Sequence, residues 1–349
     1  MPRVAAPAAE PVSASVKFLA VDDESAGQRL DNFLFRHLKG VPKTHVYRII
    51  RSGEVRVNKA RAAADTRLAA GDVLRLPPVR VSSRPEQAAA APAPAREFPL
   101  LHEDDWLLAI DKPAGVAVHG GSGVSFGVIE QLRAARPDAR LLELVHRLDR
   151  ETSGILLVAK KRSALTALQE QFRERETGKT YLALVEGAWP ANRKVLDAPL
   201  ARYLLPGADG EPGAGERRVR VVAKDHPDAM RAVTLVRVVA PLQLQGDATA
   251  MTLLAVTIKT GRTHQIRVHL ASAGHPIAGD DKYGQFERNR TLQKLGLKRM
   301  FLHAWRLRFT HPASGERMAL ETGLPAELRA ILPPPVFPAL AAVPSPHLE

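Results

Sequence analysis

The sequence predicts an α+β protein, in which a mixed sheet with a few helices follows a small separate block at the N-terminus. Six short runs rich in β-branched residues predict strands, and the helical patterns between them lack the regular strand–helix alternation of a doubly wound sheet. The stretch SSRPEQAAAAPAPA at 82–95 separates the two blocks, because it has too little apolar surface to fold.

The predicted domain boundaries follow from composition. A chain of 349 residues is long enough for two domains. Both ends share the Ala/Pro-rich composition of the connector and predict flexible tails, although Phe337 and Leu340 are suited to pack against the main domain. We expect an N-terminal tail at 1–17, a small domain at 18–80, a linker at 81–97, a main domain at 98–332 and a C-terminal tail at 333–349.

Two helices and then two strands are expected in the small domain. The apolar spacing at 30–38 predicts a first helix, with Gly40 as its stop. Thr44 is the expected N-cap of a second helix. The segments 54–58 and 72–76 predict two short strands.

Positive charge gathers on the second of these helices. The chain has 50 Lys and Arg against 37 Asp and Glu, a net charge of +13, and the block 18–80 alone has twelve against seven. Lys43, Arg48 and Arg51 on the helix and Arg56 on the next strand are candidate phosphate ligands. A solvated helix face is the alternative interpretation of such a charge run. The expected class of partner is a nucleic acid.

The chain lacks both cysteine and any long apolar run. The absence of cysteine excludes disulfides, thiolate nucleophiles and cysteine-ligated zinc. Charged residues interrupt every apolar run before the ~18 residues that a membrane span requires, and residues 1–15 lack a continuous apolar segment. We therefore expect a cytoplasmic protein with no membrane partner, and a monomer as its simplest state.

Six strands are predicted in the main domain, with two helices between them. Ser163 is the expected cap of a helix through Arg175, and Thr263 that of a helix at 264–273, which Gly274 ends. The strands are predicted at 106–110, 155–159, 181–185, 233–239, 251–258 and 303–309.

The segment VHRLDRETSG at 145–154 is the first that could carry chemistry. It precedes the apolar strand ILLVA, and Asp149 lies among His146, Arg147 and Arg150. Neighbouring cations favour an ionised carboxylate, which at the mouth of a strand could act as nucleophile or base. An ordinary loop, in which Asp149 and Thr152 hydrogen-bond the turn, is the alternative.

The segment 259–283 brings several basic side chains to a junction between a strand and a helix. Arg262, His264, Arg267, His269 and His275 crowd this region. If a helix starts at position 263, Arg267 lies about one turn from His264 and can point toward the same mouth as the carboxylate described above. Arginine is suited to a bidentate contact with a carboxylate or phosphate.

The remaining motifs mainly exclude kinds of site, namely nucleotide-binding loops and metal centres. The Gly-rich run 111–123 lacks the endings of a P-loop or a dinucleotide fold, so it is expected to form a rigid turn that lines a cleft. The histidines lack metal-ligand spacing, which predicts no metal site. Tyr181, which enters a strand after Lys179, is either a core residue or a platform for stacking on a base.

Five segments of the main domain resemble the motifs of the RluA-type pseudouridine synthases. They are DKPAGVAVHGG, HRLDRETSG, KTYLALVEG, GRTHQIRVHLASAGHPIAGDDKYG and FLHAWRLRFTHP, in this order. The small domain, with GQRLDNFLFRHLKGVPKTHVYRIIRSGEVRVN, is similar to the alpha-L RNA-binding module. The combination resembles the RluC-like branch, which acts on 23S ribosomal RNA. The resemblance implies a mostly antiparallel sheet with a central cleft, and the isomerisation of uridine to pseudouridine.

The resemblance also implies roles for residues at matching positions. The nucleophile would be Asp149, with Arg267 paired to its carboxylate. Arg147 would take the place of the extruded uridine in the RNA helix, and Tyr181 would stack on the target uracil. No cofactor is expected, because the isomerisation involves no net redox change or hydrolysis. The further RNA contacts expected in the main domain are His146, Arg262 and His264.

Three features depart from the family pattern. The insertion at 206–215 is long, both tails are rich in Ala and Pro, and Met230 and Arg231 stand where many relatives carry Gly-Lys. The last change is expected to alter an RNA contact. Two other functions stay open at this point: a non-catalytic RNA-binding factor in ribosome assembly, and a pseudouridine synthase that acts on tRNA.

Overall fold

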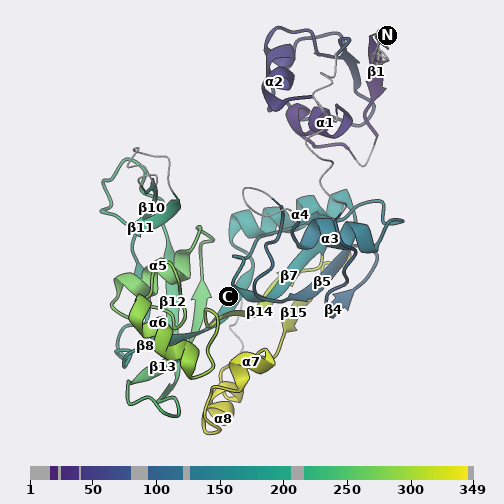
Figure 1. Ribbon diagram of the computed structural model, residues 1–349. Helices are drawn as coiled ribbons and strands as arrows, with labels where there is room; N and C mark the ends of the chain where they lie inside the picture. Colours follow the sequence, from purple (N-terminus) through teal and green to yellow (C-terminus); the bar gives the residue numbers. More distant parts are fainter. Residues whose placement is uncertain are drawn as a thin grey trace, which may run out of the picture. The chain divides into compact units, whose positions relative to one another are not determined.

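The computed structural model describes residues 16–22, 25–38, 41–79, 93–120, 126–205 and 216–344 (Figure 1). The chain divides into two compact units, Met1–Pro92 and Ala93–Glu349. The expected helix stop at Gly40, the insertion at 206–215 and most of the expected linker lie outside the described residues. Within these residues, every helix is too short or too polar to cross a membrane.

Two helices pack on a three-stranded antiparallel sheet in the first unit. The strands pair in the order β1 (Lys17–Ala20), β3 (Val73–Leu76) and β2 (Arg56–Val57). Helices α1 (Leu30–His37) and α2 (Lys43–Arg51) each bury one apolar stripe, as their 3.6-residue spacing predicts. The buried side chains of this core include Leu30, Phe33 and Leu34 of α1, Val46, Ile49 and Ile50 of α2, and Leu74 and Leu76 of β3.

Two details of this unit differ from the prediction. Strand β1 was not predicted, because its residues are largely exposed, with Phe18 at 66%, and only pairing with β3 defines it. The predicted N-cap Thr44 is wrong. It lies inside α2, which begins one residue earlier after Pro42 and has no side-chain cap.

A ten-stranded sheet dominates the second unit and confirms the predicted mixed, mostly antiparallel α+β fold. The only parallel pairing recorded for the described strands joins β7 to β14. Strand β15 (Arg317–Glu321) pairs with β14 and β6 (Glu143–Leu144) with β7. The main order is β4 (Leu100–Glu103), β5 (Leu107–Lys112), β7 (Ser153–Ala159), β14 (Leu302–Thr310), β8 (Gly178–Glu186), β13 (Met251–Ile258), β12 (Val233–Leu242) and β9 (Val195–Asp197).

Strand β7 is apolar on both faces because a helix covers each of them. Leu156 and Val158 pack with α3 (Val128–Ala135), and Ile155 and Leu157 pack with α4 (Arg162–Glu174). Side chains alternate between the faces of a strand, so this layering explains why the whole run is buried. Figure 1 shows both helices beside β5 and β7.

The other half of the sheet carries α5 (Gln265–Ser272) and α6 (Phe286–Lys294). Both helices contribute to the core formed with β8 and β13. Strands β10 (Leu200–Leu204) and β11 (Arg217–Val221) form a separate hairpin, and β11 packs near α5 (Figure 1). This arrangement brings α5, β8 and the hairpin to one region.

Three expectations for the second unit are corrected. Ser163 lies inside α4, whose N-cap is Lys161, and Thr263 precedes the N-cap of α5, which is His264. The segment 333–349, expected to be a C-terminal tail, contains one helix, α8 (Val336–Ala341), and α7 (Ala326–Arg329) ends just before it. Val336 is buried, so apolar packing outweighs the Pro-rich composition here.

Candidate active site

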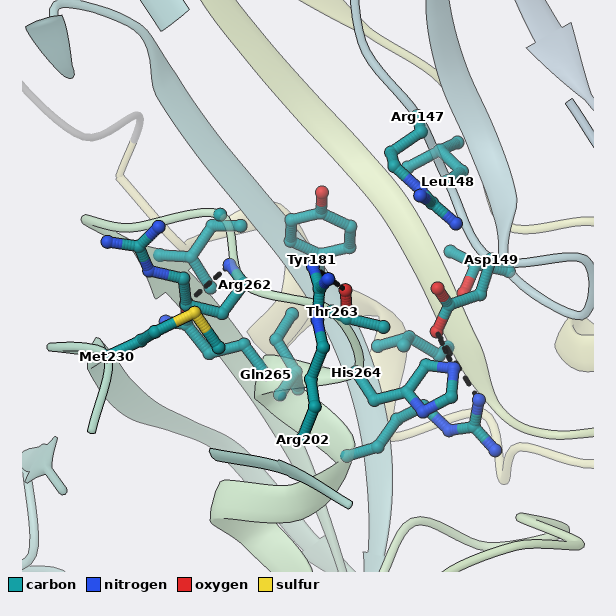
Figure 2. Close-up of a pocket in the computed structure, with 16 residues that line it drawn as sticks. Arg147, Leu148, Asp149, Tyr181, Arg202, Met230, Arg262, Thr263, His264 and Gln265 are labelled. Atoms are coloured by element: carbon teal, nitrogen blue, oxygen red, sulfur yellow. Dashed lines mark hydrogen bonds and ion pairs between the residues drawn. The ribbon is translucent and has the colours of Figure 1, made fainter. Parts of the chain in front are cut away.

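Asp149 lies on the loop between β6 and β7, at the border of two adjoining cavities. One cavity of about 220 Å³ is lined by Asp149, Arg147, Tyr181, His264 and Arg267, among others (Figure 2). Asp149 also lines the second, of about 630 Å³. Its side chain is 21% exposed, so the carboxylate is accessible to a ligand but largely surrounded by protein.

Lys112, at the end of β5, holds the loop of Asp149 against the Gly-rich loop. Its buried Nζ donates to the carbonyl oxygens of Pro113 (2.8 Å), Val116 (2.9 Å) and Arg150 (3.1 Å). Burial lowers the pKa of Lys112 to about 7. A single side chain therefore fixes the spacing of the two loops, and no pattern in the sequence pointed to it.

The exit of the loop is fixed by close backbone packing. Gly154 has φ +111°, and a Cβ on it would lie 2.2 Å from the carbonyl oxygen of Ala304 in β14. Arg299 donates to the carbonyl of Glu151 (3.2 Å) and to Oγ of Ser153 (2.9 Å). Only glycine permits this approach of β7 to β14, and both strands hold the loop in place.

Arg267 on α5 joins Asp149 to a second carboxylate. Its Nη1 donates to Oδ2 of Asp149 at 3.3 Å, and its Nε and Nη2 donate to the two oxygens of Asp280, each at 2.7 Å. Asp280 also accepts from the backbone N–H groups of Lys282 and Tyr283. The bidentate pair fixes the plane of the guanidinium and hence the donor that reaches Asp149.

Burial and charge act in opposite directions on this pair. Burial would raise the pKa of Asp280, but the hydrogen bond and charge of Arg267 outweigh it and hold this pKa below its usual value. Burial would likewise lower the pKa of Arg267, and Asp280 raises it. Both groups are thus ionised at neutral pH, beside the carboxylate of Asp149.

His264 and Tyr181 complete the wall of the smaller cavity. His264 has φ +52°, and its Nε2 lies 3.9 Å from Oδ2 of Asp149. Burial, and next the charge of Asp149, raises the pKa of Tyr181 above its usual value, so its hydroxyl stays protonated. In Figure 2 the ring of Tyr181 stands between Asp149 and the side of the cavity formed by Met230 and Arg262.

The structure brings most, but not all, of the predicted residues of the main domain together. Arg147 and Arg262 are exposed and line the smaller cavity. His146 does not reach it: its ring stacks on Phe172 at 4.7 Å, and its Nε2 accepts from the N–H of Leu157. Burial lowers the pKa of His146 to about 3, so the expectation of a cationic RNA contact there is corrected.

Two further histidines of the segment 259–283 are structural. His269 hydrogen-bonds Thr234 and the carbonyl of Ala198, and His275 contacts the carbonyl of Glu186. Across the part of the chain that the structure describes, no three His, Asp or Glu side chains are grouped so that they could hold a metal ion.

Arg202 and Asp280 belong to the site without having been assigned a role from the sequence, and Met230 stood out only as a departure from the family pattern. Arg202 on β10 and Met230 line the smaller cavity, and Nη2 of Arg202 lies 3.4 Å from the hydroxyl of Thr263. Asp280 stood in the quoted segment GDDKY without an assigned role. Its spacing from Arg267 spans a helix end and a turn, which periodicity does not resolve.

The predicted cations of the first unit lie on α2 and β2. Arg48 and Arg51 are exposed, Arg48 contacts the ring of His45 at 3.3 Å, and Arg56 is half-buried. Lys43 is the first residue of α2, and its side chain lies outside the described atoms. Arg48 and Arg51 are therefore accessible to a polyanion.

Comparisons with known proteins find a matching family model in each of the two units. A family model described as RNA pseudouridylate synthase matches residues 106–272, and an S4 domain model matches residues 28–74. Two proteins named "Ribosomal large subunit pseudouridine synthase C", from Salmonella typhimurium and Escherichia coli K12, are each 50% identical over 323 residues, which is 91% of this chain and 96% of theirs.

Two solved structures share the fold of the second unit. The one titled "Human RNA Pseudouridylate Synthase Domain Containing 4" is 30% identical with a TM-score of 0.51, and covers 66% of this chain and 93% of its own. The one titled "Human RNA Pseudouridylate Synthase Domain Containing 1" is 26% identical with a TM-score of 0.54, and covers 72% and 97%.

Proposed function

The chain belongs to the RNA pseudouridylate synthase family, and on this premise we propose that it isomerises uridines of large-subunit ribosomal RNA with Asp149 as the nucleophile. The observation that carries the proposal is the placement of the Asp149 carboxylate in a cavity, 3.3 Å from a guanidinium that a buried carboxylate orients. The names of the relatives and the S4 domain support ribosomal RNA as the substrate.

The reaction exchanges one bond of the ribose for another. The bond from C1′ to N1 of uracil breaks, the base turns, and C1′ bonds to C5, which loses its proton while N1 gains one. A carboxylate can attack C1′ or assist glycal formation and so retain the sugar. Because the base stays in the cavity, its recombination with the sugar is effectively intramolecular.

We assign parts of this reaction to side chains whose positions support the roles. Arg267 stabilises and orients the carboxylate of Asp149. Tyr181 offers an aromatic face and a protonated hydroxyl to the base. A duplex uridine must first leave the stack, which costs a few kcal/mol. Arg147 is exposed and lines both cavities, which supports a role in filling the space that the uridine leaves.

The first unit supplies affinity for RNA without taking part in the chemistry. The exposed Arg48 and Arg51 on α2, with Arg56 on β2, are suited to contact phosphates through long-range attraction. Such contacts place the RNA without reading its sequence. The choice of uridine then depends on the walls of the cavity, to which Arg202, Met230 and Arg262 contribute.

Substitution of Asp149 tests the nucleophile. Asp149→Asn keeps the shape of the side chain and removes its charge, so we expect no tritium release from large-subunit RNA labelled at C5 of uridine, with RNA affinity retained. Asp138→Asn, an exposed carboxylate after α3, is the matched control and should keep full activity. Turnover by Asp149→Asn at the wild-type rate would refute the assignment.

Mapping of the product tests the substrate. Carbodiimide primer extension of ribosomal RNA and tRNA from cells that lack the gene should show a missing pseudouridine in the large-subunit RNA, restored by the wild-type protein. A signal lost from tRNA alone would overturn the ribosomal assignment. Unchanged RNA in both fractions would favour a binding factor without catalytic activity.

A further inference from the structure

The hydrogen bonds around Tyr283 favour one tautomer of His264. The backbone N–H of Val219 in β11 donates to the phenolic oxygen of Tyr283 at 3.1 Å. That oxygen lies 2.8 Å from Nδ1 of His264. A tyrosine hydroxyl has one proton to donate, and Nδ1 is in position to accept it. The arrangement favours an unprotonated Nδ1, because the phenolic proton then has an acceptor.

The other face of the imidazole favours the same tautomer. Nε2 of His264 faces Oδ2 of Asp149 at 3.9 Å. A proton on Nε2 points a positive dipole at the carboxylate, whereas a lone pair there would repel it. Burial, opposed by the charge of Asp149, lowers the pKa of His264, so the neutral ring is the expected form at neutral pH. Tyr283 and Asp149 thus select the Nε2–H tautomer from opposite sides.

The space beside Nε2 fits an oxygen of the substrate. A distance of 3.9 Å is too long for a hydrogen bond. An oxygen atom about 2.8 Å from both Nε2 and Oδ2 would accept from the first and donate to the second. Oδ2 already accepts from Arg267, and among the described residues Oδ1 of Asp149 has no hydrogen-bond partner, which leaves Oδ1 to react with C1′. The ribose hydroxyl adjacent to C1′ is the 2′-hydroxyl.

We propose that the Nε2–H of His264 donates to the 2′-hydroxyl of the target uridine while that hydroxyl donates to Oδ2 of Asp149, and that Tyr283 is the positioning residue that holds His264 in this tautomer. The inference rests on the proposed function, because it places the ribose at Asp149. His264 is then a catalytic residue that recognises RNA by its sugar. Tyr283 acts through it, and connects β11 to the cavity by the bond from Val219.

The tautomer can be measured in the free enzyme, independently of any activity. Nitrogen-15 NMR of histidine-labelled protein separates the two neutral tautomers, and His264→Gln identifies the signals of His264. We expect Nε2–H in the wild type and a mixture of tautomers in Tyr283→Phe, which keeps the ring that packs 5.6 Å from His264. Tyr203→Phe, on β10 of the hairpin that contains Val219, is the control and should leave the signals unchanged. An Nδ1–H tautomer in the wild type would overturn the proposal.

The contact with ribose can be tested by removing either partner. In an Asp149→Asn background, which blocks conversion, binding is compared for two RNAs that contain uridine or 2′-deoxyuridine at the mapped target. Loss of the hydroxyl should weaken binding about fivefold to tenfold when His264 is present, and less than about twofold after His264→Ala. An equal loss in both proteins would refute the contact.

Failure of this inference differs from failure of the proposed function. If Asp149→Asn still converts uridine, the nucleophile is wrong, whatever the binding shows. If conversion stops but the deoxyuridine penalty is independent of His264, the nucleophile stands and the role of His264 is refuted. Trp106, Trp189 and Trp305 all lie in the second unit, so their fluorescence reports whether each variant is folded.

Discussion

Among the described residues, each unit contains one bidentate pair of arginine and aspartate, and the two pairs differ in how far the arginine is exposed to water, since both aspartates are buried. Arg29 bonds both oxygens of Asp31, at 3.1 and 2.8 Å, with 43% of the arginine side chain exposed. Arg267 bonds both oxygens of Asp280 with only 4% exposed. The first guanidinium faces solvent, whereas the second directs its remaining donor at Asp149.

The difference shows what burial contributes to a site. A pair with an exposed arginine is weak because water solvates the guanidinium and salt screens it. The buried Asp31 also accepts from the N–H of Asn32 and the hydroxyl of Tyr47, so it does not depend on Arg29 alone. A buried pair gains little net stability because desolvation opposes its attraction, but loss of one partner leaves an uncompensated charge. The pair of Arg267 and Asp280 therefore serves mainly to orient a charge at Asp149, whereas among the described residues the pair of Arg29 and Asp31 has no such neighbouring site.

The largest difference between the units is expected when the arginine of each pair is replaced in turn, by Arg267→Met or Arg29→Met. Arg267→Met leaves Asp280 buried without its counter-charge, so we expect a loss of about 3–5 kcal/mol in the free energy of unfolding of the second unit. Activity should fall at least about a hundredfold, because Asp149 loses its oriented donor. Urea titration followed by tryptophan fluorescence measures the first effect, and tritium release measures the second.

Arg29→Met is the matched substitution in the first unit. It should leave the tryptophan transition and the turnover rate unchanged, and alter only hydrogen exchange of α1. If Arg267→Met unfolds at the wild-type urea concentration, the buried pair is not what holds this site together.

One glycine in each unit provides a second contrast, between a packed and an unpacked backbone position. Gly154→Ala would place a Cβ against the backbone of Ala304 at φ +111°, and should destabilise the second unit by about 2–4 kcal/mol. Gly27 in the first unit also has a positive φ, +77°, but has no atom within 4 Å of a Cβ. Gly27→Ala should cost about 1 kcal/mol, from backbone strain alone. Thermal unfolding measures both, and equal losses would contradict the role assigned to packing.

Lowering the pH should show how far the stability of the second unit depends on Asp280. Its pKa is depressed in the folded state, so it contributes stability above its unfolded value of about 3.9, and this contribution is lost as the pH falls through the lower folded value. The urea midpoint of the second unit should therefore fall below about pH 4 in the wild type. In Asp280→Asn it should start lower at pH 7 and fall less. Parallel curves would show that Asp280 is not the titrating group.

The sequence predicted the parts of the site that local spacing encodes. The helical turn between His264 and Arg267 placed both side chains at one mouth, and the order of motifs placed Asp149 before a buried strand. His146 was misassigned because neighbouring residues alternate in direction, and Phe172 on α4 captures its ring. Asp280 was missed because it meets Arg267 through a turn whose path depends on tertiary packing.

The same limit applies to the fold. Long apolar strands such as β7 and β13 were predicted within a few residues, because burial on both faces leaves a continuous signal. Strand β1 has almost no such signal, since pairing with β3 alone defines it. The hairpin of β10 and β11, which brings Arg202 and Val219 to the site, owes its position to contacts with α5 and Tyr283 that no local pattern contains.

The smallest expected effect concerns the exposed cations of α2. The double substitution Arg48→Glu and Arg51→Glu should weaken binding of large-subunit RNA about tenfold at low salt and reduce the slope of log affinity against log salt by about two, because each side chain contacts a phosphate in water. The turnover rate of the bound complex should not change, since these charges are solvated and remote in sequence from Asp149.

The control is the double substitution Arg61→Glu and Arg67→Glu, which are exposed on the same unit and make the same change in net charge. If the control weakens binding equally, the first unit attracts RNA by net charge alone, and the edge formed by α2 has no specific role. If instead the α2 variant loses turnover at saturating RNA, exposed charges in this unit contribute to the chemical step. That result would contradict the claim that exposed arginines only bind RNA whereas the buried Arg267 acts on Asp149.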